Sequence, residues 1–134
     1  MVGWQAGVTG EVPFHDVDSM SIVWHGHYFK YFELARTALM RQLNYDTPEM
    51  IASGYSWPVV ESHCQYRHPL RLGQSFEVRA EVSGYESRLE ISYQIHSAGQ
   101  LVAKGFTAQA AVAMPAAELC LVTPEVLRRA LGVL

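Results

Sequence analysis

Two carboxylates and three imidazoles lie within fourteen consecutive residues near the start of the chain: His15, Asp16, Asp18, His25 and His27. A long apolar pattern typical of a helix begins where this segment ends. The first backbone N–H groups of a helix have no intrahelical partner and carry partial positive charge. A carboxylate beside them would pair a base or nucleophile with donors that polarise a carbonyl. Acyl-group hydrolysis needs both.

Two other interpretations of these residues remain open. Asp side chains commonly accept hydrogen bonds from nearby backbone N–H groups, so Asp18 could serve only to close a turn or cap a helix. His25 could likewise close the loop through hydrogen bonds. His15 and His27 have no third ligand at a spacing typical of zinc. We therefore expect no metal site.

Length and composition limit the class of protein. The chain has 134 residues, which fits a single domain over 1–134, and its 49% hydrophobic and 17% charged residues are typical of a globular protein. A net charge of −3 gives no reason to expect nucleic acid or an anionic membrane as partner. Cys64 and Cys120 form no metal-spaced pair and are expected to be reduced thiols. With no signal peptide or membrane-spanning stretch visible, we expect a cytoplasmic protein.

The pattern of apolar residues predicts one central helix among several strands. The helix signal is apolar over most of its circumference, so other structure must nearly surround it. Period-two alternation predicts strands that follow one another in meander order. The predicted elements are a strand over 8–14, a loop over 15–26, a helix over 27–44, a helical turn over 48–52, strands over 57–67, 75–82, 89–95 and 101–114, and a helix to 132 with Thr123 as its N-cap.

Three motifs carry a resemblance to a known family. The chain reads Asp16-Val17-Asp18 followed by Val23-Trp24-His25, then Tyr28 through Phe32-Glu33-Leu34-Ala35-Arg36, and later Tyr66-Arg67-His68-Pro69-Leu70-Arg71-Leu72-Gly73. In these motifs it resembles hotdog-fold acyl-CoA thioesterases of the 4-hydroxybenzoyl-CoA thioesterase class. The subgroup most similar in appearance accompanies the Tol–Pal system of bacteria. The resemblance covers roughly residues 8–115. It implies an α+β hotdog fold, in which a five-stranded antiparallel sheet wraps around one long helix.

The resemblance also implies catalytic roles. Asp18 would attack the thioester carbonyl or activate a water for that attack. The backbone N–H near His25 would polarise the carbonyl, and the His25 ring would orient Asp18 or pass a proton. We expect Asp16 to be structural, since two ionised carboxylates at one carbonyl would repel each other. Glu33, on the buried helix, is expected to pair with Arg36 or with backbone donors.

Substrate-binding residues are predicted from the same comparison. Tyr28 is either a core aromatic or part of the site, and His63 and Arg67 would face one side of their strand, in a substrate channel or an oligomer interface. Guanidinium groups bind phosphate bidentately, which suits the phosphates of coenzyme A. Arginines on the solvated face of a strand are usually ordinary surface residues. The candidates for the phosphate contact are Arg67, Arg71, Arg88 and Lys104.

The predicted reaction is hydrolysis of an acyl-CoA or acyl-carrier-protein thioester to free acid and thiol. Coenzyme A or phosphopantetheine would belong to the substrate, and no cofactor is expected. Hotdog domains typically form homodimers, often paired into homotetramers, with active sites between protomers.

Two alternatives remain. The family often has Gly shortly after the second Asp, where this chain has Ser19-Met20-Ser21, which leaves open a non-catalytic subunit that binds acyl thioesters. A hotdog 3-hydroxyacyl-thioester dehydratase is less favoured, because its His-x-x-x-x-Pro-x-x-Pro-Gly motif is absent.

Overall fold

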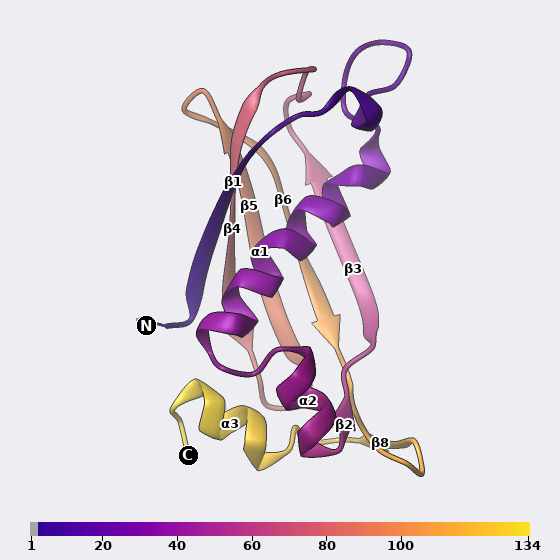
Figure 1. The fold of residues 1–134 in the computed structure, drawn as a ribbon, viewed down its shortest axis with the longest axis vertical. Helices are drawn as coiled ribbons and strands as arrows, with labels where there is room; N and C mark the ends of the chain where they lie inside the picture. Colours follow the sequence, from indigo (N-terminus) through magenta and orange to yellow (C-terminus); the bar gives the residue numbers. More distant parts are fainter. Residues whose placement is uncertain (1–2) are drawn as a thin grey trace.

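A computed structural model describes residues 3–134 (Figure 1). The five long strands are β1 (Gln5–Glu11), β3 (Val59–Tyr66), β4 (Ser75–Gly84), β5 (Leu89–Ser97) and β6 (Gln100–Gln109). The helices are η1 (Phe14–Asp16), η2 (His25–His27), α1 (Tyr28–Gln42), α2 (Thr47–Ser53) and α3 (Glu125–Leu131), where η marks a 3-10 helix. Three short strands, β2 (Tyr55–Ser56), β7 (Ala111–Ala113) and β8 (Glu118–Cys120), form a second sheet.

The large sheet has the strand order β1-β4-β5-β6-β3 and is antiparallel throughout. Helix α1 lies across one face of it (Figure 1). The predicted arrangement of a five-stranded antiparallel sheet around one long helix is confirmed. β1 and β3 are the edge strands, and all but one residue of β3 are exposed.

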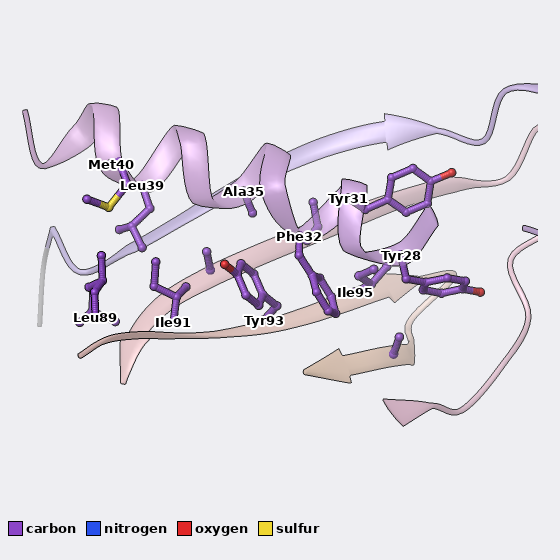
Figure 2. Packing of buried hydrophobic residues seen from close by; sticks show 14 of the residues in the cluster. Tyr28, Tyr31, Phe32, Ala35, Leu39, Met40, Leu89, Ile91, Tyr93 and Ile95 are labelled. Atoms are coloured by element: carbon purple, nitrogen blue, oxygen red, sulfur yellow. The ribbon is translucent and has the colours of Figure 1, made fainter. Parts of the chain in front are cut away.

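Burial of α1 against the sheet forms the core. Its inward side chains include Phe32, Ala35 and Leu39, each fully buried. They meet the inward residues of β5, which alternate along that strand as Leu89, Ile91, Tyr93 and Ile95 (Figure 2). The Phe32 ring stacks on that of Tyr93, with centroids 4.5 Å apart and planes 9° from parallel. The helix ends as predicted near Asn44, whose left-handed φ of 57° takes the chain out of the helix.

Three predicted boundaries are wrong. β1 begins at Gln5 and ends at Glu11 rather than spanning 8–14, because pairing with β4 fixes it and Phe14 belongs to η1. The predicted strand 101–114 is divided at Ala110, whose N–H donates to the carbonyl of Pro58, so that β7 joins the small sheet. Thr123 does not cap α3; its hydroxyl donates to the carbonyl of Tyr85. The helical turn predicted over 48–52 is confirmed as α2.

Within residues 3–134, no helix combines the length and apolar character needed to cross a bilayer.

Gly105 allows α1 and β3 to approach β6 closely. A Cβ there would lie 2.1 Å from the carbonyl oxygen of His63 and 2.8 Å from the Phe32 ring. We expect Gly105→Ala to lower the free energy of unfolding by about 3 kcal/mol, because either the β3 backbone or the core must move. Urea denaturation measures the loss.

Gly7→Ala is the matched control, because a Cβ at Gly7 in β1 would make only contacts of 3.6 Å. Its unfolding free energy should change far less. Equal losses in the two variants would contradict the steric account of Gly105.

Candidate active site

Asp18 lies at the tip of a tight hairpin in the loop before α1. Val17 pairs with Val23 across the hairpin, and the Asp18 N–H donates to the Ile22 carbonyl at 2.9 Å. Asp18 Oδ1 accepts the N–H of Met20 at 2.8 Å. The structure therefore shows the turn role that the sequence left open. The other carboxylate oxygen of this exposed side chain has no hydrogen-bond partner within residues 3–134.

Ser21 completes the turn in a conformation that favours glycine. Its φ is 62°, and its N–H donates to the Asp18 carbonyl at 3.0 Å. Glycine adopts such angles without steric cost, whereas serine does so with some strain. The hairpin is therefore tightly closed even though Ser19-Met20-Ser21 contains no glycine.

Asp16 is buried at the base of the same loop, with 1% of its surface exposed. Its carboxylate accepts hydrogen bonds from the Lys30 ammonium and, at 2.7 Å, from the Tyr31 hydroxyl. Burial raises the pKa of Asp16, but these hydrogen bonds and the Lys30 charge outweigh burial and hold the pKa below its usual value. The Asp16 carbonyl also accepts the Trp24 N–H at 3.0 Å. Asp16 thus fixes both sides of the loop to the first turns of α1.

The start of the helix is where the sequence predicts N–H groups that polarise a carbonyl. η2 runs directly into α1, and the N–H groups of His25 and Gly26 have no acceptor within residues 3–134. The His25 carbonyl accepts the Tyr66 hydroxyl at 2.7 Å. The His25 ring packs on that of Trp24, with centroids 4.9 Å apart, and makes no hydrogen bond to Asp18. The side chains of the two predicted catalytic residues are not joined within one protomer.

A pocket of about 260 Å³ opens beside this helix start. It brings together three predicted site residues, His25, Tyr28 and Arg67. Tyr66, which opens one of the motifs of the resemblance but was given no role in the site, also lines it. Tyr28 is both a core aromatic and a pocket residue: it is buried, and its hydroxyl oxygen accepts the Leu70 N–H at 3.3 Å. Burial raises the pKa of Tyr28. The site therefore combines an aromatic wall, unpartnered backbone donors and a cation.

Comparison with known proteins identifies the family. Residues 12–130 match the model of the thioesterase-like superfamily. The chain belongs to the thioesterase-like superfamily. It is 32% identical over 96 residues to a putative acyl-CoA thioesterase, YneP of Bacillus subtilis, a match covering 70% of each chain. It is 26% identical over 72 residues to the acyl-CoA thioester hydrolase YbgC of Escherichia coli, covering 54% of each.

A solved structure supports the same placement. The hypothetical protein TT1821 of Thermus thermophilus superposes with a TM-score of 0.84 at 32% identity, covering 96% of this chain and 98% of that one. The predicted hotdog fold and the predicted class of thioester hydrolase are thereby confirmed at the level of the superfamily.

The remaining predicted site residues of this thioesterase-like chain lie elsewhere. His63 stacks on Phe106, with ring centroids 5.7 Å apart, and lines a different pocket from Arg67, which follows the end of β3. Arg88 pairs with Glu61 at 3.1 Å and with Glu90 at 3.2 Å.

Three other predicted residues lie in separate parts of the fold. Arg71 is exposed and pairs through its backbone with Ile22, near the loop. Lys104 lines the same pocket as His63. Glu33 pairs with Arg36 at 2.7 Å as predicted, but its side chain is exposed rather than buried, because it lies outside the buried face of α1 that Phe32, Ala35 and Leu39 form.

A larger pocket, about 420 Å³, was not predicted. It lies between α1 and α2, and Arg36, Met40, Trp57 and Gln109 help to line it. Gln109 is buried, and its Oε1 has no hydrogen-bond partner within residues 3–134. In the sequence, the only signal for this pocket was a polar residue, Gln109, within an apolar strand. The segments that line the pocket come together only in the fold.

The Asp16 cluster predicts a pH-dependent loss of stability. Asp16→Asn should lower the free energy of unfolding at pH 7 by about 1.5–3 kcal/mol, because charge-assisted hydrogen bonds are lost. The folded-state pKa of Asp16 is depressed, so its stabilisation is complete above the unfolded pKa of about 3.9 and is lost as pH falls through the folded pKa. Urea denaturation at pH 7 and pH 3 should show the difference shrinking in acid.

Glu125→Gln is the control, because Glu125 forms an exposed pair with Arg129 on α3 at 3.8 Å. That variant should match wild type at both pH values. A loss in Asp16→Asn that does not vary with pH would contradict the ionised, paired state of Asp16.

Proposed function

We propose that this protein hydrolyses the thioester of an acyl-CoA to a free acid and coenzyme A. The observation that carries the proposal is the pair of unpartnered N–H groups at His25 and Gly26, at the start of α1 and beside an aromatic pocket. Preorganised backbone donors of this kind stabilise the charge that develops on a carbonyl oxygen under attack. Family membership and the acyl-CoA substrates named for two relatives support the same reaction.

In the proposed mechanism, the thioester oxygen accepts hydrogen bonds from these two N–H groups. Asp18 either attacks the carbonyl carbon or removes a proton from an attacking water. The tetrahedral intermediate collapses, the C–S bond breaks, and the thiolate leaves with the bonding electron pair. After direct attack, water hydrolyses the acyl–Asp18 anhydride. The reaction as proposed requires neither metal nor redox cofactor.

We further propose a homodimer paired through β3, with the homotetramer as a higher assembly. Edge strands present unpaired backbone groups, and β3 also exposes the apolar side chains Val59 and Val60. The 8 residues of β3 span about 26 Å, from the α1–α2 pocket near Trp57 to the pocket at Tyr66. Antiparallel pairing of two copies would therefore place the α1–α2 pocket of one protomer opposite the Tyr66 pocket of its partner. In such a dimer, the Asp18 loop of one protomer would serve the site of its partner.

Arg67 and Arg71 are the proposed contacts for the coenzyme A phosphates, because both lie near the pocket and have no carboxylate partner within residues 3–134. Arg88 is less suited, since two carboxylates already hold it. A carrier-protein thioester would present the same phosphopantetheine arm without the nucleotide phosphates. The free thiols of Cys64 and Cys120 favour the cytoplasm, and we keep the 4-hydroxybenzoyl-CoA thioesterase class as the proposed subgroup.

A non-catalytic acyl-thioester-binding subunit is the second candidate. The engagement of Asp18 Oδ1 by the Met20 N–H favours it, because a turn role alone would explain this residue. The two candidates differ in turnover rather than in binding.

Asp18→Asn tests the mechanism. The amide oxygen can still accept the Met20 N–H, so the hairpin should persist, while the nucleophile or base is lost. We expect kcat for thiol release to fall about 100-fold or more. The assay uses short, long and aromatic acyl-CoAs and matching carrier-protein thioesters. Glu86→Gln, an exposed carboxylate between β4 and β5, is the control that should keep full activity.

Full activity in Asp18→Asn would show that another residue is catalytic. Wild-type protein that binds acyl-CoA but releases no thiol from any substrate would favour the binding subunit.

Val60→Lys tests the dimer. A lysine on the edge of β3 should disfavour strand pairing, so sedimentation velocity should show a shift toward monomer. Thr9→Lys, an exposed position on the other edge strand, β1, is the control and should sediment as wild type. A wild-type monomer, or equal effects of the two variants, would contradict pairing through β3.

A further inference from the structure

Tyr66 links the edge strand β3 to the backbone at the start of α1. Its hydroxyl donates to the carbonyl oxygen of His25 at 2.7 Å, across 41 residues of sequence. The proposed reaction does not use this hydroxyl directly. The peptide that Tyr66 contacts, however, belongs to the group of donors at the proposed site.

Peptide geometry connects that contact to the donors. In a planar trans peptide, the C=O and the N–H point in opposite directions, so fixing one fixes the other. The Trp24 carbonyl accepts the His27 N–H at 2.9 Å, which holds the His25 N–H of the same peptide. The His25 carbonyl accepts the Tyr66 hydroxyl, which holds the Gly26 N–H. Both free donors thus belong to peptides whose carbonyls are engaged.

The two peptides are held by different parts of the molecule. The first is held within its own helical turn, whereas the second receives an additional bond from a side chain of the sheet. A hydrogen bond to a carbonyl also polarises the peptide and strengthens its N–H as a donor. Tyr66 therefore influences both the direction and the donor strength of the Gly26 N–H.

Tyr66 is itself held in a defined place. Its ring meets the Tyr28 ring edge to face, with centroids 4.9 Å apart and planes at 90°. Burial, followed by the neighbouring Cys64 and Tyr28, raises the pKa of Tyr66 to about 12. The hydroxyl thus remains a donor throughout the neutral range. Because 44% of the residue is exposed, loss of the hydroxyl alone should leave the fold intact.

We propose that Tyr66 is a positioning residue for thioester hydrolysis, which acts by orienting and polarising the His25–Gly26 peptide. The inference rests on the proposed function, in which the N–H groups of His25 and Gly26 bind the thioester oxygen. Tyr66 does not contact the reacting atoms in this role, and the proton stays on its hydroxyl throughout.

Tyr66→Phe tests the inference, since phenylalanine retains the ring that packs on Tyr28. We expect kcat to fall about tenfold with KM changed less than twofold, because the effect is confined to the developing oxyanion. Removing an oxyanion donor outright lowers kcat about 100- to 1,000-fold. Tyr66 should matter less, because it acts on the oxyanion only through the His25–Gly26 peptide. The kcat–pH profile should keep its shape at the lower level, because Tyr66 exchanges no proton.

Tyr85→Phe is the matched control. Its ring packs on Trp4, whose indole N–H donates to the carbonyl of Leu131 at the end of α3, and neither residue lines the pocket at the helix start. This variant should keep wild-type kcat. Urea unfolding of both variants should give wild-type midpoints, so a lower kcat in Tyr66→Phe would not reflect unfolding.

Four results would overturn the inference. An unchanged kcat in Tyr66→Phe would show that the peptide needs no side-chain anchor. A raised KM with unchanged kcat would make Tyr66 a substrate contact, and a shifted alkaline limb would make it an acid or base. Wild-type protein without thiol release would overturn the proposed function and this inference together, whereas the first three results leave that function standing.

Discussion

The burial of α1 against the large sheet is the constraint on which the rest of the structure depends. Phe32 stacks on Tyr93, and Gly105 leaves the space that brings the helix and β3 close to β6. Because the helix is fixed along its length, its N-terminus has a defined place near the end of β3 (Figure 1). The donors at His25 and Gly26 depend on that place.

Two polar anchors add to the apolar packing in holding the start of α1 in place. Asp16 holds the loop to α1 through Lys30 and Tyr31, and Tyr66 reaches the helix start from β3. The first anchor is buried and ionic, whereas the second is neutral and partly exposed. Each joins two segments that lie apart in the sequence. Asp16 therefore contributes to the stability of the fold, whereas Tyr66 contributes to the geometry of the backbone donors.

Much of the fold could be predicted from the sequence, and less of the site. The period of α1 and the alternation of β5 report burial directly, so the central helix and its sheet were predictable. Such patterns do not indicate which strand or carbonyl a residue will pair with. The division of the strand at Ala110 and the role of Thr123 were therefore missed. The shared pocket of His25, Tyr28 and Arg67 was only partly predictable, since it depends on where β3 ends. Tyr66 gave no separate signal, because its role depends on a contact with a distant peptide.

Polarisation of a thioester carbonyl by the backbone donors at the start of α1 is the step on which the proposed function depends. The most direct measurement is the infrared C=O stretch of a carbonyl-¹³C-labelled acyl-CoA bound to Asp18→Asn, in which turnover is slow. We expect a band at lower frequency than that of the free thioester, because hydrogen bonds to the oxygen weaken the C=O bond. A bound thioester whose band matches that of the free ligand would contradict this polarisation.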